Sequence, residues 1–214
     1  MAYWPDIERP RAQSPQYQNF RQMGLNEMLL DNRIIFLDLP LDPRIMVNSS
    51  TVCSHTIKSM LYLQSVKRDS DIHLYINCPG GDIDDTLAIY DTMKFLTCDI
   101  ATYCVGNASS GAAVIMAAGT KGKRFALPNA KVMIHQPWGM VGGQASDMRI
   151  QAEEILKVKS TLINIIARET GKTPEQVELD TERDRYMDAN EALKYGLIDE
   201  VLGEGKADKK KKSK

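Results

Sequence analysis

Two adjacent serines stand where a nucleophile could be held. Ser109 and Ser110 follow an apolar run, residues 100–105, that predicts a buried strand, and they precede a small-residue apolar run, residues 114–118, that predicts a buried helix. At such a joint a hydroxyl can lie at the end of a sheet, and the N–H groups of the helix start favour negative charge. A serine nucleophile and its oxyanion hole need this geometry. Serine is equally common as a helix N-cap, so the stretch alone leaves both roles open.

His135 is the candidate base among the three histidines. It ends a predicted strand, residues 131–135, so its ring can lie at a sheet edge near Ser110. His55 falls inside a predicted helix and His73 inside a predicted strand, and neither has a comparable setting. Since a serine nucleophile requires a base, His135 is expected to take the proton.

The base in turn requires an orienting carboxylate, and a charged segment after His135 offers several. The same charges would also suit a salt-bridged surface, so the spacing chooses no single one. The competing carboxylates are Asp180, Glu182, Asp184 and Asp188.

A second oxyanion donor is expected at the glycine pair Gly80-Gly81. The pair follows a predicted strand, residues 72–77, and precedes a helix that opens with Asp82. Only glycine lets a backbone amide approach a substrate this closely. The alternative is an ordinary turn.

Alternating strands and helices must position these groups, and they predict an α/β domain with a mainly parallel sheet. Strands are expected at residues 33–37, 72–77, 100–105, 123–127, 131–135 and 198–202. Helices are expected at residues 25–32, 47–67 and 188–195. Three more are expected to begin at Asp82, at Ser110 and at Thr173. A long helix is expected to be capped by Ser146-Asp147, to run to about Thr170 and to stop at Gly171.

The helix expected at residues 146–170 is apolar over more than one face. A stripe from Met148 to Ile165 is widened by Leu156, Ile163 and Ile166. Such a helix is usually covered on more than one side. The second cover is either a partner subunit or the chain's own core.

Composition and charge narrow the classes of function. The 214 residues are 43% apolar and 26% charged, which suits a globular domain with a substantial core. Residues 206–214 hold six Lys and one Asp, so they carry a net charge of +5 and residues 1–205 carry −6. An acidic body gives no reason to expect nucleic acid as the main ligand. No apolar run could span a bilayer and the N-terminus lacks the features of a secretory signal, so no membrane partner is expected.

The cysteines predict neither a disulfide framework nor a metal site. They form no CxxC pair and show no metal-ligand spacing with the histidines. Buried, reduced thiols in a cytosol-like compartment are the simplest interpretation. The four residues are Cys53, Cys78, Cys98 and Cys104.

Several long motifs, in order, resemble the proteolytic subunit of the Clp protease family (ClpP). The resemblance runs from about Leu25 to Leu202. Its motifs are Tyr75-Ile76-Asn77-Cys78-Pro79-Gly80-Gly81, Ile89-Tyr90-Asp91-Thr92-Met93, residues 117–125, Val132-Met133-Ile134-His135-Gln136-Pro137, residues 143–147 and residues 180–186.

The resemblance implies the role of each site residue. Ser110 becomes the nucleophile, His135 the general base and Asp184 the orienting carboxylate. The oxyanion hole falls to the backbone N–H groups of Gly81 and Gly111.

The resemblance further implies a serine endopeptidase with a crotonase-like ClpP fold. The peptidase domain would span residues 25–203, between an irregular arm, residues 1–24, and a disordered Lys-rich tail, residues 204–214. A protruding handle at about residues 139–170, a Gly-rich strand followed by the long helix, would join two stacked heptameric rings of this chain.

A Clp-type hexameric unfoldase ATPase would deliver unfolded proteins to these rings. ATP would belong to that partner, because this chain lacks the Gly-x-x-x-x-Gly-Lys-Ser/Thr phosphate loop. No cofactor and no metal are expected for the chain itself, and its expected location is cytoplasmic, with an organelle interior as the alternative. Two other functions stay open: a non-catalytic structural ring subunit, and a crotonase-type acyl-CoA enzyme with a similar backbone oxyanion hole.

Some positions depart from the family pattern. Gly111 stands where the family usually has Met, and Cys78 where it commonly has Ser. Asn107 replaces a common Gln, and Trp138 replaces a frequent Leu. Gly111 still offers its backbone N–H, but with more local freedom than a bulkier residue would have.

Overall fold

The computed structural model of the chain describes residues 23–139 and 142–203, and a mainly parallel sheet runs through them. The seven-stranded sheet has the order β1-β4-β5-β6-β9, with β7 beside β5 and β8 beside β7, and only the β7–β8 pair in it is antiparallel. The expected α/β class is thereby confirmed. The strands are β1 (Ile34–Leu37), β4 (Ile72–Cys78), β5 (Ile100–Ser109), β6 (Arg124–Ala126), β7 (Lys131–Ile134), β8 (Arg185–Asp188) and β9 (Glu200–Val201).

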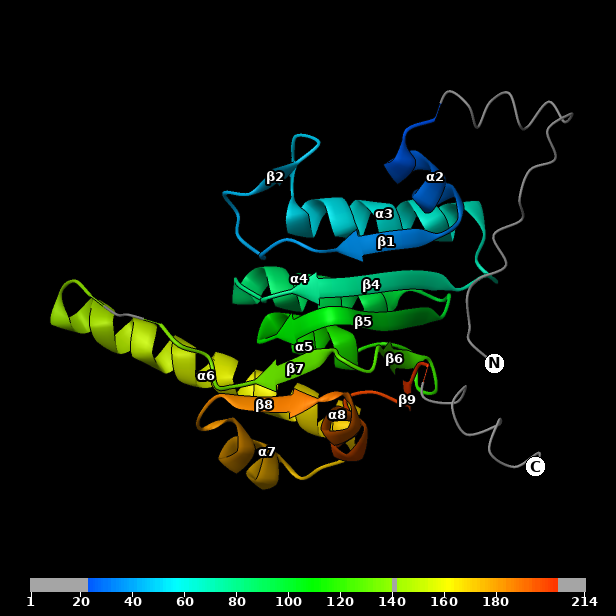
Figure 1. Cartoon of the computed structure of the whole chain (residues 1–214). Coiled ribbons are helices and arrows are strands. Elements are labelled where there is room, and N and C mark those ends of the chain that lie inside the picture. Colours follow the sequence, from blue (N-terminus) through cyan, green and yellow to red (C-terminus); the bar gives the residue numbers. More distant parts are fainter. Residues whose placement is uncertain (1–22, 140–141, 204–214) are drawn as a thin grey trace, which may run out of the picture.

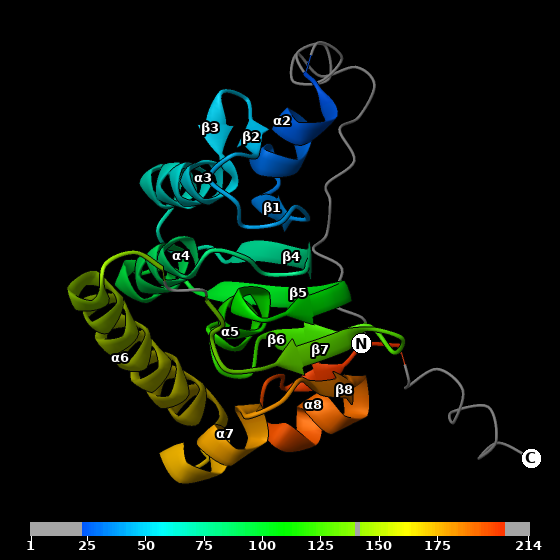
Figure 2. The ribbon, with the colours of Figure 1, turned by 90° about the vertical axis from the view of Figure 1, so that its left-hand side faces the viewer.

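Helices cover one face of this sheet and enclose the main apolar core. Figures 1 and 2 show α3 and α4 side by side along β1 and β4, with α5 next to them below β5 and α6 projecting past the sheet. The helices are α2 (Leu25–Asp31), α3 (Val52–Val66), α4 (Ile83–Phe95), α5 (Gly111–Ala117), α6 (Ala145–Thr170), α7 (Pro174–Thr181) and α8 (Ala189–Tyr195).

The helix expected at residues 47–67 begins later, because a small hairpin precedes it. Strands β2 (Met46–Val47) and β3 (Ser50–Thr51) pair antiparallel across a two-residue turn. Both turn residues, Asn48 and Ser49, have positive φ, as tight hairpin turns require. Thr51 then caps α3, since its hydroxyl accepts a hydrogen bond from the Ser54 N–H at 3.2 Å.

Two strands differ from expectation in a way that matters for the site. The strand expected to end at residue 105 continues to Ser109, so β5 reaches the nucleophile candidates. Strand β8 was not expected at all, because its sequence is charged and only Met187 of it is buried. A strand with one buried side chain carries no visible alternation of apolar and polar residues.

The long helix α6 ends as expected at Gly171, which adopts the left-handed conformation with φ 74°. Its start is corrected: Gln144 is the N-cap, and Ser146 and Asp147 already lie inside the helix. The Gly-rich strand expected before it is absent from the described residues there, because Gly139, Gly142 and Gly143 belong to no strand. Residues 140–141 lie outside the described residues, as do the expected arm up to residue 22 and the Lys-rich tail.

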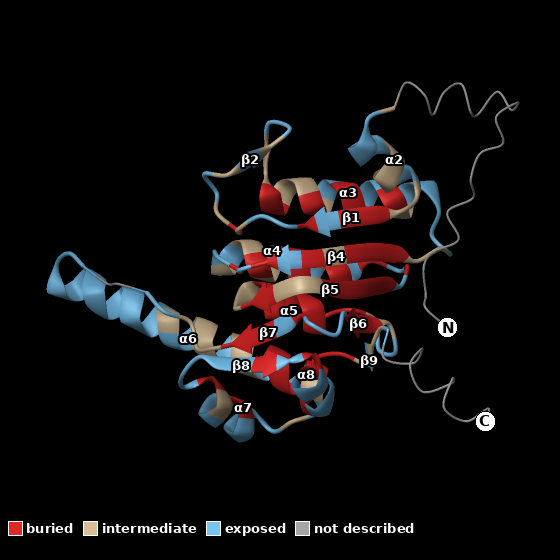
Figure 3. Cartoon of the chain, viewed as in Figure 1, coloured by how far each residue is buried: buried red, intermediate tan, exposed pale blue. Residues whose placement is uncertain are grey.

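Only the C-terminal part of α6 is covered by the chain's own core. Ile165 and Ile166 are buried, whereas Ile150 is 60% exposed and Leu156 is 65% exposed. Figure 3 shows the outer length of the helix as a continuous exposed rod. The chain's own core therefore accounts for one end of the apolar surface, and the outer part has no cover within the described residues.

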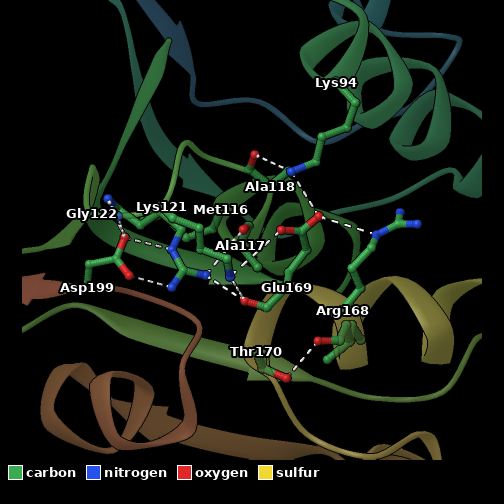
Figure 4. A network of polar contacts seen from close by, with 12 residues as sticks. Lys94, Met116, Ala117, Ala118, Lys121, Gly122, Arg168, Glu169, Thr170 and Asp199 are labelled. Carbon is green, nitrogen blue, oxygen red and sulfur yellow. Dashed lines mark hydrogen bonds and ion pairs between the residues drawn. The ribbon is translucent and has the colours of Figure 1, made fainter.

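A polar network connects the C-terminal end of α6 to the C-terminal end of α5 (Figure 4). The buried Arg124 guanidinium donates to the backbone carbonyls of Ala117 and Glu169, near the ends of α5 and α6, at 3.4 and 2.9 Å. These carbonyls have no partner within their helices. The Glu169 carboxylate accepts from Tyr90 at 2.7 Å and pairs with Lys94 at 2.8 Å. Because Ser110 directly precedes α5, the network holds α6 in place relative to the candidate nucleophile.

Asp199 completes this network and makes it sensitive to acid. It binds the Arg124 guanidinium through both carboxylate oxygens, at 2.8 and 2.5 Å. Burial opposes ionisation of Asp199, but the hydrogen bonds and charge of Arg124 outweigh burial and lower the pKa of the carboxyl below its ordinary 3.8. Because the pKa of Asp199 is lower in the folded than in the unfolded state, the ionised carboxylate stabilises the fold above pH 3.8. This stabilisation is lost as the pH falls through the lowered pKa.

We therefore expect Asp199→Asn to destabilise the fold by about 3 kcal/mol at pH 7, because it leaves a buried guanidinium without its charge partner. The difference from the unmodified chain should shrink as the pH falls from 5 toward 3. Denaturant unfolding at several pH values measures it. Asp42→Asn is the control, since Asp42 pairs with an Arg44 that is 88% exposed, and it should change little. An acid profile identical for D199N and the unmodified chain would contradict the expectation.

Candidate active site

Ser110 occupies a sharp turn between β5 and α5. Its backbone lies at φ 56° and ψ −125°, a conformation that a residue with a side chain rarely adopts. A similar strained strand-to-helix turn exposes the nucleophilic serine in enzymes of the α/β-hydrolase fold. Although Ser110 stands at the N-cap position, its side chain makes no capping hydrogen bond. Its Oγ lies 2.9 Å from Nε2 of His135 instead, so the capping interpretation is wrong.

The neighbouring hydroxyl of Ser109 is already engaged. Ser109 is buried, and its Oγ donates to Oδ1 of Asn107 at 2.7 Å. The Asn107 amide in turn donates to the backbone carbonyl of Cys78, so Asn107 ties β5 to the end of β4. Of the two serines that the sequence left open, only Ser110 contacts a base.

Sheet register brings His135 to Ser110. Strand β7 pairs with the last residues of β5, with Ser109 opposite Met133, and the Ser110 N–H donates to the Met133 carbonyl at 2.8 Å. His135 is the first residue after β7, so its ring reaches the turn that carries Ser110. Of the other histidines, His55 lies in α3, and His73 contacts the Tyr103 hydroxyl at 3.0 Å.

Asp184 lies on the far side of the histidine ring, with its Oδ1 3.2 Å from His135 Nδ1. Strands β7 and β8 place Ile134 opposite Arg185, and the next pair in this register is His135 and Asp184. A carboxylate only accepts hydrogen bonds, so Nδ1 carries the proton and Nε2 is left to accept from the Ser110 hydroxyl. The three side chains therefore form one directed chain of hydrogen bonds.

Two of the competing carboxylates, Asp180 and Asp188, have other partners. Asp180 forms an ion pair with Arg185 and accepts from the Tyr195 hydroxyl at 3.0 Å. Asp188 caps α8, since its carboxylate accepts from the Glu191 N–H at 2.8 Å. The backbone carbonyl of Glu182 accepts from the Gln136 amide, which holds the segment before Asp184 against the end of β7. In the structure, strand pairing separates Asp184 from these neighbours. The charge pattern alone left them open, and the family resemblance implied Asp184.

Gly80 and Gly81 bring a turn directly against the nucleophile. A Cβ on Gly80 would lie 2.5 Å from the Ser109 carbonyl oxygen and 2.9 Å from the Gly111 nitrogen, so only glycine permits this approach. Leu41 bridges the residues on either side of Gly81, since it donates to the Gly80 carbonyl and accepts from the Asp82 N–H. The Gly81 N–H takes no part in this bridge.

The Gly111 N–H is the other candidate donor at this turn. Gly111 is the first residue of α5, and an N–H at that position has no partner within the helix. The N–H groups of a helix start also favour a developing negative charge. Gly81 and Gly111 both line the cavity beside Ser110, so the two expected oxyanion donors lie at one site.

Apart from His135 and Thr86, apolar side chains line the rest of this cavity. They come from four different parts of the chain and include two residues of α6. The C-terminal part of α6 therefore forms one wall of the site. The apolar residues are Ile83, Val114, Ile134, Pro137, Leu162 and Ile166. Such a lining favours an apolar group of a ligand next to Ser110.

Two departures from the family pattern have plain structural settings. Cys78 is fully buried at the end of β4, where its thiol donates to the Leu39 carbonyl and accepts from the Gly80 N–H at 3.3 Å. It therefore helps to hold the glycine turn, while burial raises the pKa of its thiol. All four cysteines are free and buried, as expected. Trp138 is 75% exposed and does not line the cavity.

Clusters of metal ligands and membrane-spanning helices were both sought in the described residues. No three His, Cys, Asp or Glu side chains in residues 23–139 and 142–203 gather to hold a metal ion. In the same residues, no helix has the length and apolarity needed to cross a membrane.

An α/β domain with a serine, a histidine and a carboxylate in line beside two backbone donors has the form of a serine hydrolase. Comparison with known proteins narrows this class. The family model for Clp protease matches residues 17–205, and the chain therefore belongs to the Clp protease family, whose members are serine-type peptidases. A curated relative, ATP-dependent Clp protease proteolytic subunit 1 of Rhodopirellula baltica, is 50% identical over 191 residues, which cover 89% of this chain and 81% of that protein. The family expected from the sequence motifs is confirmed, and the match begins inside the arm that was set apart from the peptidase domain.

Proposed function

We propose that this chain is the peptide-cleaving subunit of an ATP-dependent, self-compartmentalised protease. The observation that carries the proposal is the position of His135, with Nε2 2.9 Å from Ser110 Oγ and Nδ1 3.2 Å from Asp184 Oδ1. A hydrogen-bonded series of this kind is what activates a serine for attack on a carbonyl.

The first half of the reaction forms an acyl-enzyme. Nε2 of His135 takes the proton of Ser110 as Oγ attacks the peptide carbonyl carbon, and the carbonyl electrons move to its oxygen. The N–H groups of Gly81 and Gly111 stabilise the resulting oxyanion. Asp184 stabilises the protonated ring of His135. The ring then gives its proton to the leaving amine as the peptide C–N bond breaks.

The second half returns the enzyme to its starting state. His135 takes a proton from water, whose oxygen attacks the acyl carbon, and the same two N–H groups hold the second oxyanion. The ester bond to Ser110 then breaks, and His135 returns the proton to Oγ. The chain's own residues account for each proton, so the proposed reaction requires no metal and no cofactor.

The substrates are unfolded polypeptides, cleaved to short peptides. The relative's name, ATP-dependent Clp protease proteolytic subunit 1, supports a Clp-type hexameric ATPase as the partner that unfolds and delivers them. In this proposal ATP is hydrolysed by the partner, and the complex acts in the cytoplasm.

Two heptameric rings of this chain, stacked through the α6 handles, would enclose the active sites. The exposed apolar side chains on the outer part of α6 support this arrangement, because Ile150 and Leu156 have no cover within the described residues. Apolar surface of this kind is typical of a contact between subunits.

Leu156→Glu should weaken the assembly, because a charge in an apolar contact loses its hydration without gaining a partner. Sedimentation and native mass should show smaller species than the unmodified chain gives. Gln151→Glu, an exposed position on the same helix, is the matched control and should leave the mass unchanged. Leu156 is preferable to Ile163, which packs partly against the chain's own core. An unchanged sedimentation coefficient for L156E would contradict the handle contact.

Labelling of the purified chain tests the proposed chemistry directly. A fluorophosphonate should modify Ser110, as read by mass spectrometry of peptides, and a fluorogenic peptide should be cleaved by the same preparation. Turnover of acyl-CoA without labelling of Ser110 would favour a crotonase-type enzyme. A chain that stays monomeric and inert until a paralogue is added would favour a structural ring subunit.

A further inference from the structure

The side chain of Thr86 fills the space that a residue with a Cβ would need at position 111. A Cβ built on Gly111 would lie 2.1 Å from Oγ1 of Thr86 and 3.1 Å from both its Cβ and its Cγ2. Gly111 does not have positive φ, so its backbone conformation does not demand glycine. Glycine is required at position 111 because the side chain of Thr86 occupies the space that a Cβ would need.

Thr86 is itself held firmly. It lies in the first turn of α4, is 1% exposed, and donates through Oγ1 to the Asp82 carbonyl at 2.8 Å. A β-branched side chain has few accessible rotamers, and this hydrogen bond selects among them. Rotation of Thr86 away from Gly111 would break the bond and would not relieve the 3.1 Å contact of its Cβ.

Thr86 thereby connects the two halves of the oxyanion hole. Its hydroxyl binds the carbonyl of Asp82, the residue after Gly81, and its side chain packs against the backbone of Gly111. Thr86, Gly81 and Gly111 also line the same cavity beside Ser110. Without this contact, the backbone of Gly111 would have neither a side chain of its own nor a packed neighbour to restrain it at the start of α5.

We infer that Thr86 is a positioning residue for catalysis, which holds the Gly111 N–H at a set distance from the Gly81 N–H. The inference rests on the proposed function, in which these two groups stabilise the oxyanion. Preorganised donors accelerate a reaction because they need no reorientation as charge develops. Thr86 supplies by packing the rigidity that a side chain at position 111 would otherwise contribute.

Thr86→Gly should lower kcat for a fluorogenic peptide by about tenfold and leave KM within about twofold, since the loosened donor acts mainly in the transition state. Gly111→Ala alone should lower kcat/KM by about 100-fold, because the new Cβ displaces either the donor or Thr86. The double variant T86G/G111A removes both the 2.1 and 3.1 Å contacts with atoms of the Thr86 side chain. It should exceed both single variants in kcat, because the alanine now restrains the backbone at position 111.

Thr92→Gly is the matched control for the loss of helix propensity. Thr92 lies on the same helix and makes the same hydrogen bond to the residue four positions earlier, Thr92 Oγ1 to the Ala88 carbonyl at 2.7 Å, but on the outer side. T92G should keep the kcat of the unmodified chain. Thr86→Ser, which retains Oγ1 and its hydrogen bond, should restore most of the activity that T86G loses.

A kcat for T86G equal to that of T92G would overturn the inference, as would a double variant no more active than G111A. Melting midpoints and native mass establish that each variant is folded and assembled. If G111A does not fold, the series T86G, T86S and T92G decides alone through kcat. Ser110→Ala separates the two levels of argument: activity retained in S110A rejects the proposed function, whereas an inactive S110A with an unaffected T86G rejects only the role of Thr86.

Discussion

Replacing Ser110 with alanine should lower peptide turnover by about 10⁶-fold, the loss seen when the nucleophile of a serine triad is removed. The other groups cannot replace it. His135 would then contact a methyl group, and the two N–H donors would have no covalent intermediate to stabilise. Any remaining hydrolysis would come from the oxyanion hole and substrate binding acting on water.

The matched control for this prediction is the neighbouring hydroxyl. Ser109 donates to Asn107 and contacts no base, so S109A should still be labelled by a fluorophosphonate at Ser110 and should still cleave peptide. Single-turnover measurements on assembled protein, with the mass checked before and after, give the rates. Peptide cleavage by S110A at more than a small fraction of the normal rate would reject Ser110 as the nucleophile.

Asp184→Asn should lower kcat by about 10⁴-fold while leaving the fold intact. An asparagine amide can donate to Nδ1 of His135, which places the ring proton on Nε2. The ring can then no longer accept the proton of Ser110. The loss is smaller than for S110A because the nucleophile is still present.

Nearby carboxylates provide the controls for this second prediction. Asp188→Asn keeps the cap of α8, since asparagine caps helices as well as aspartate does. Glu182→Gln removes an exposed charge close to Asp184. Both variants should stay close to normal in kcat, measured beside D184N at the same pH. If D188N or E182Q lost as much activity as D184N, local charge would explain the effect better than the contact with His135.

Glycines and helix caps show which helix boundaries can be predicted from local sequence. Gly171 and Gly196 both adopt the left-handed conformation that ends α6 and α8, and Thr173 caps α7, all where the sequence predicted those boundaries. The same rules missed the Asn48-Ser49 turn, because neither residue is a glycine and both still adopt positive φ. Local propensity therefore located most boundaries but not a turn imposed on ordinary residues.

The long helix shows a different limit. The sequence showed that this helix is apolar over more than one face, and it left two candidates for the cover of the second face, a partner subunit and the chain's own core. Burial separates the two: Ile165 and Ile166 face the chain's own core, while Ile150 and Leu156 do not. A pattern of side chains records which faces are apolar but not what lies against each of them.

The sequence by itself determined the α/β class, the nucleophile turn at Ser109-Ser110, the glycine turn and the best histidine, because each depends on residues close together in the chain. The family motifs implied Ser110 and Asp184, whereas the residue pattern alone left Ser109 and Asp180 open. Only the tertiary structure shows the contacts that distinguish these residues, and only it sets Thr86 against Gly111. Those outcomes depend on the register of β7 with β5 and β8 and on the packing of α4 against α5. Contacts between distant segments follow from how the whole sheet assembles, so no local pattern could have specified them.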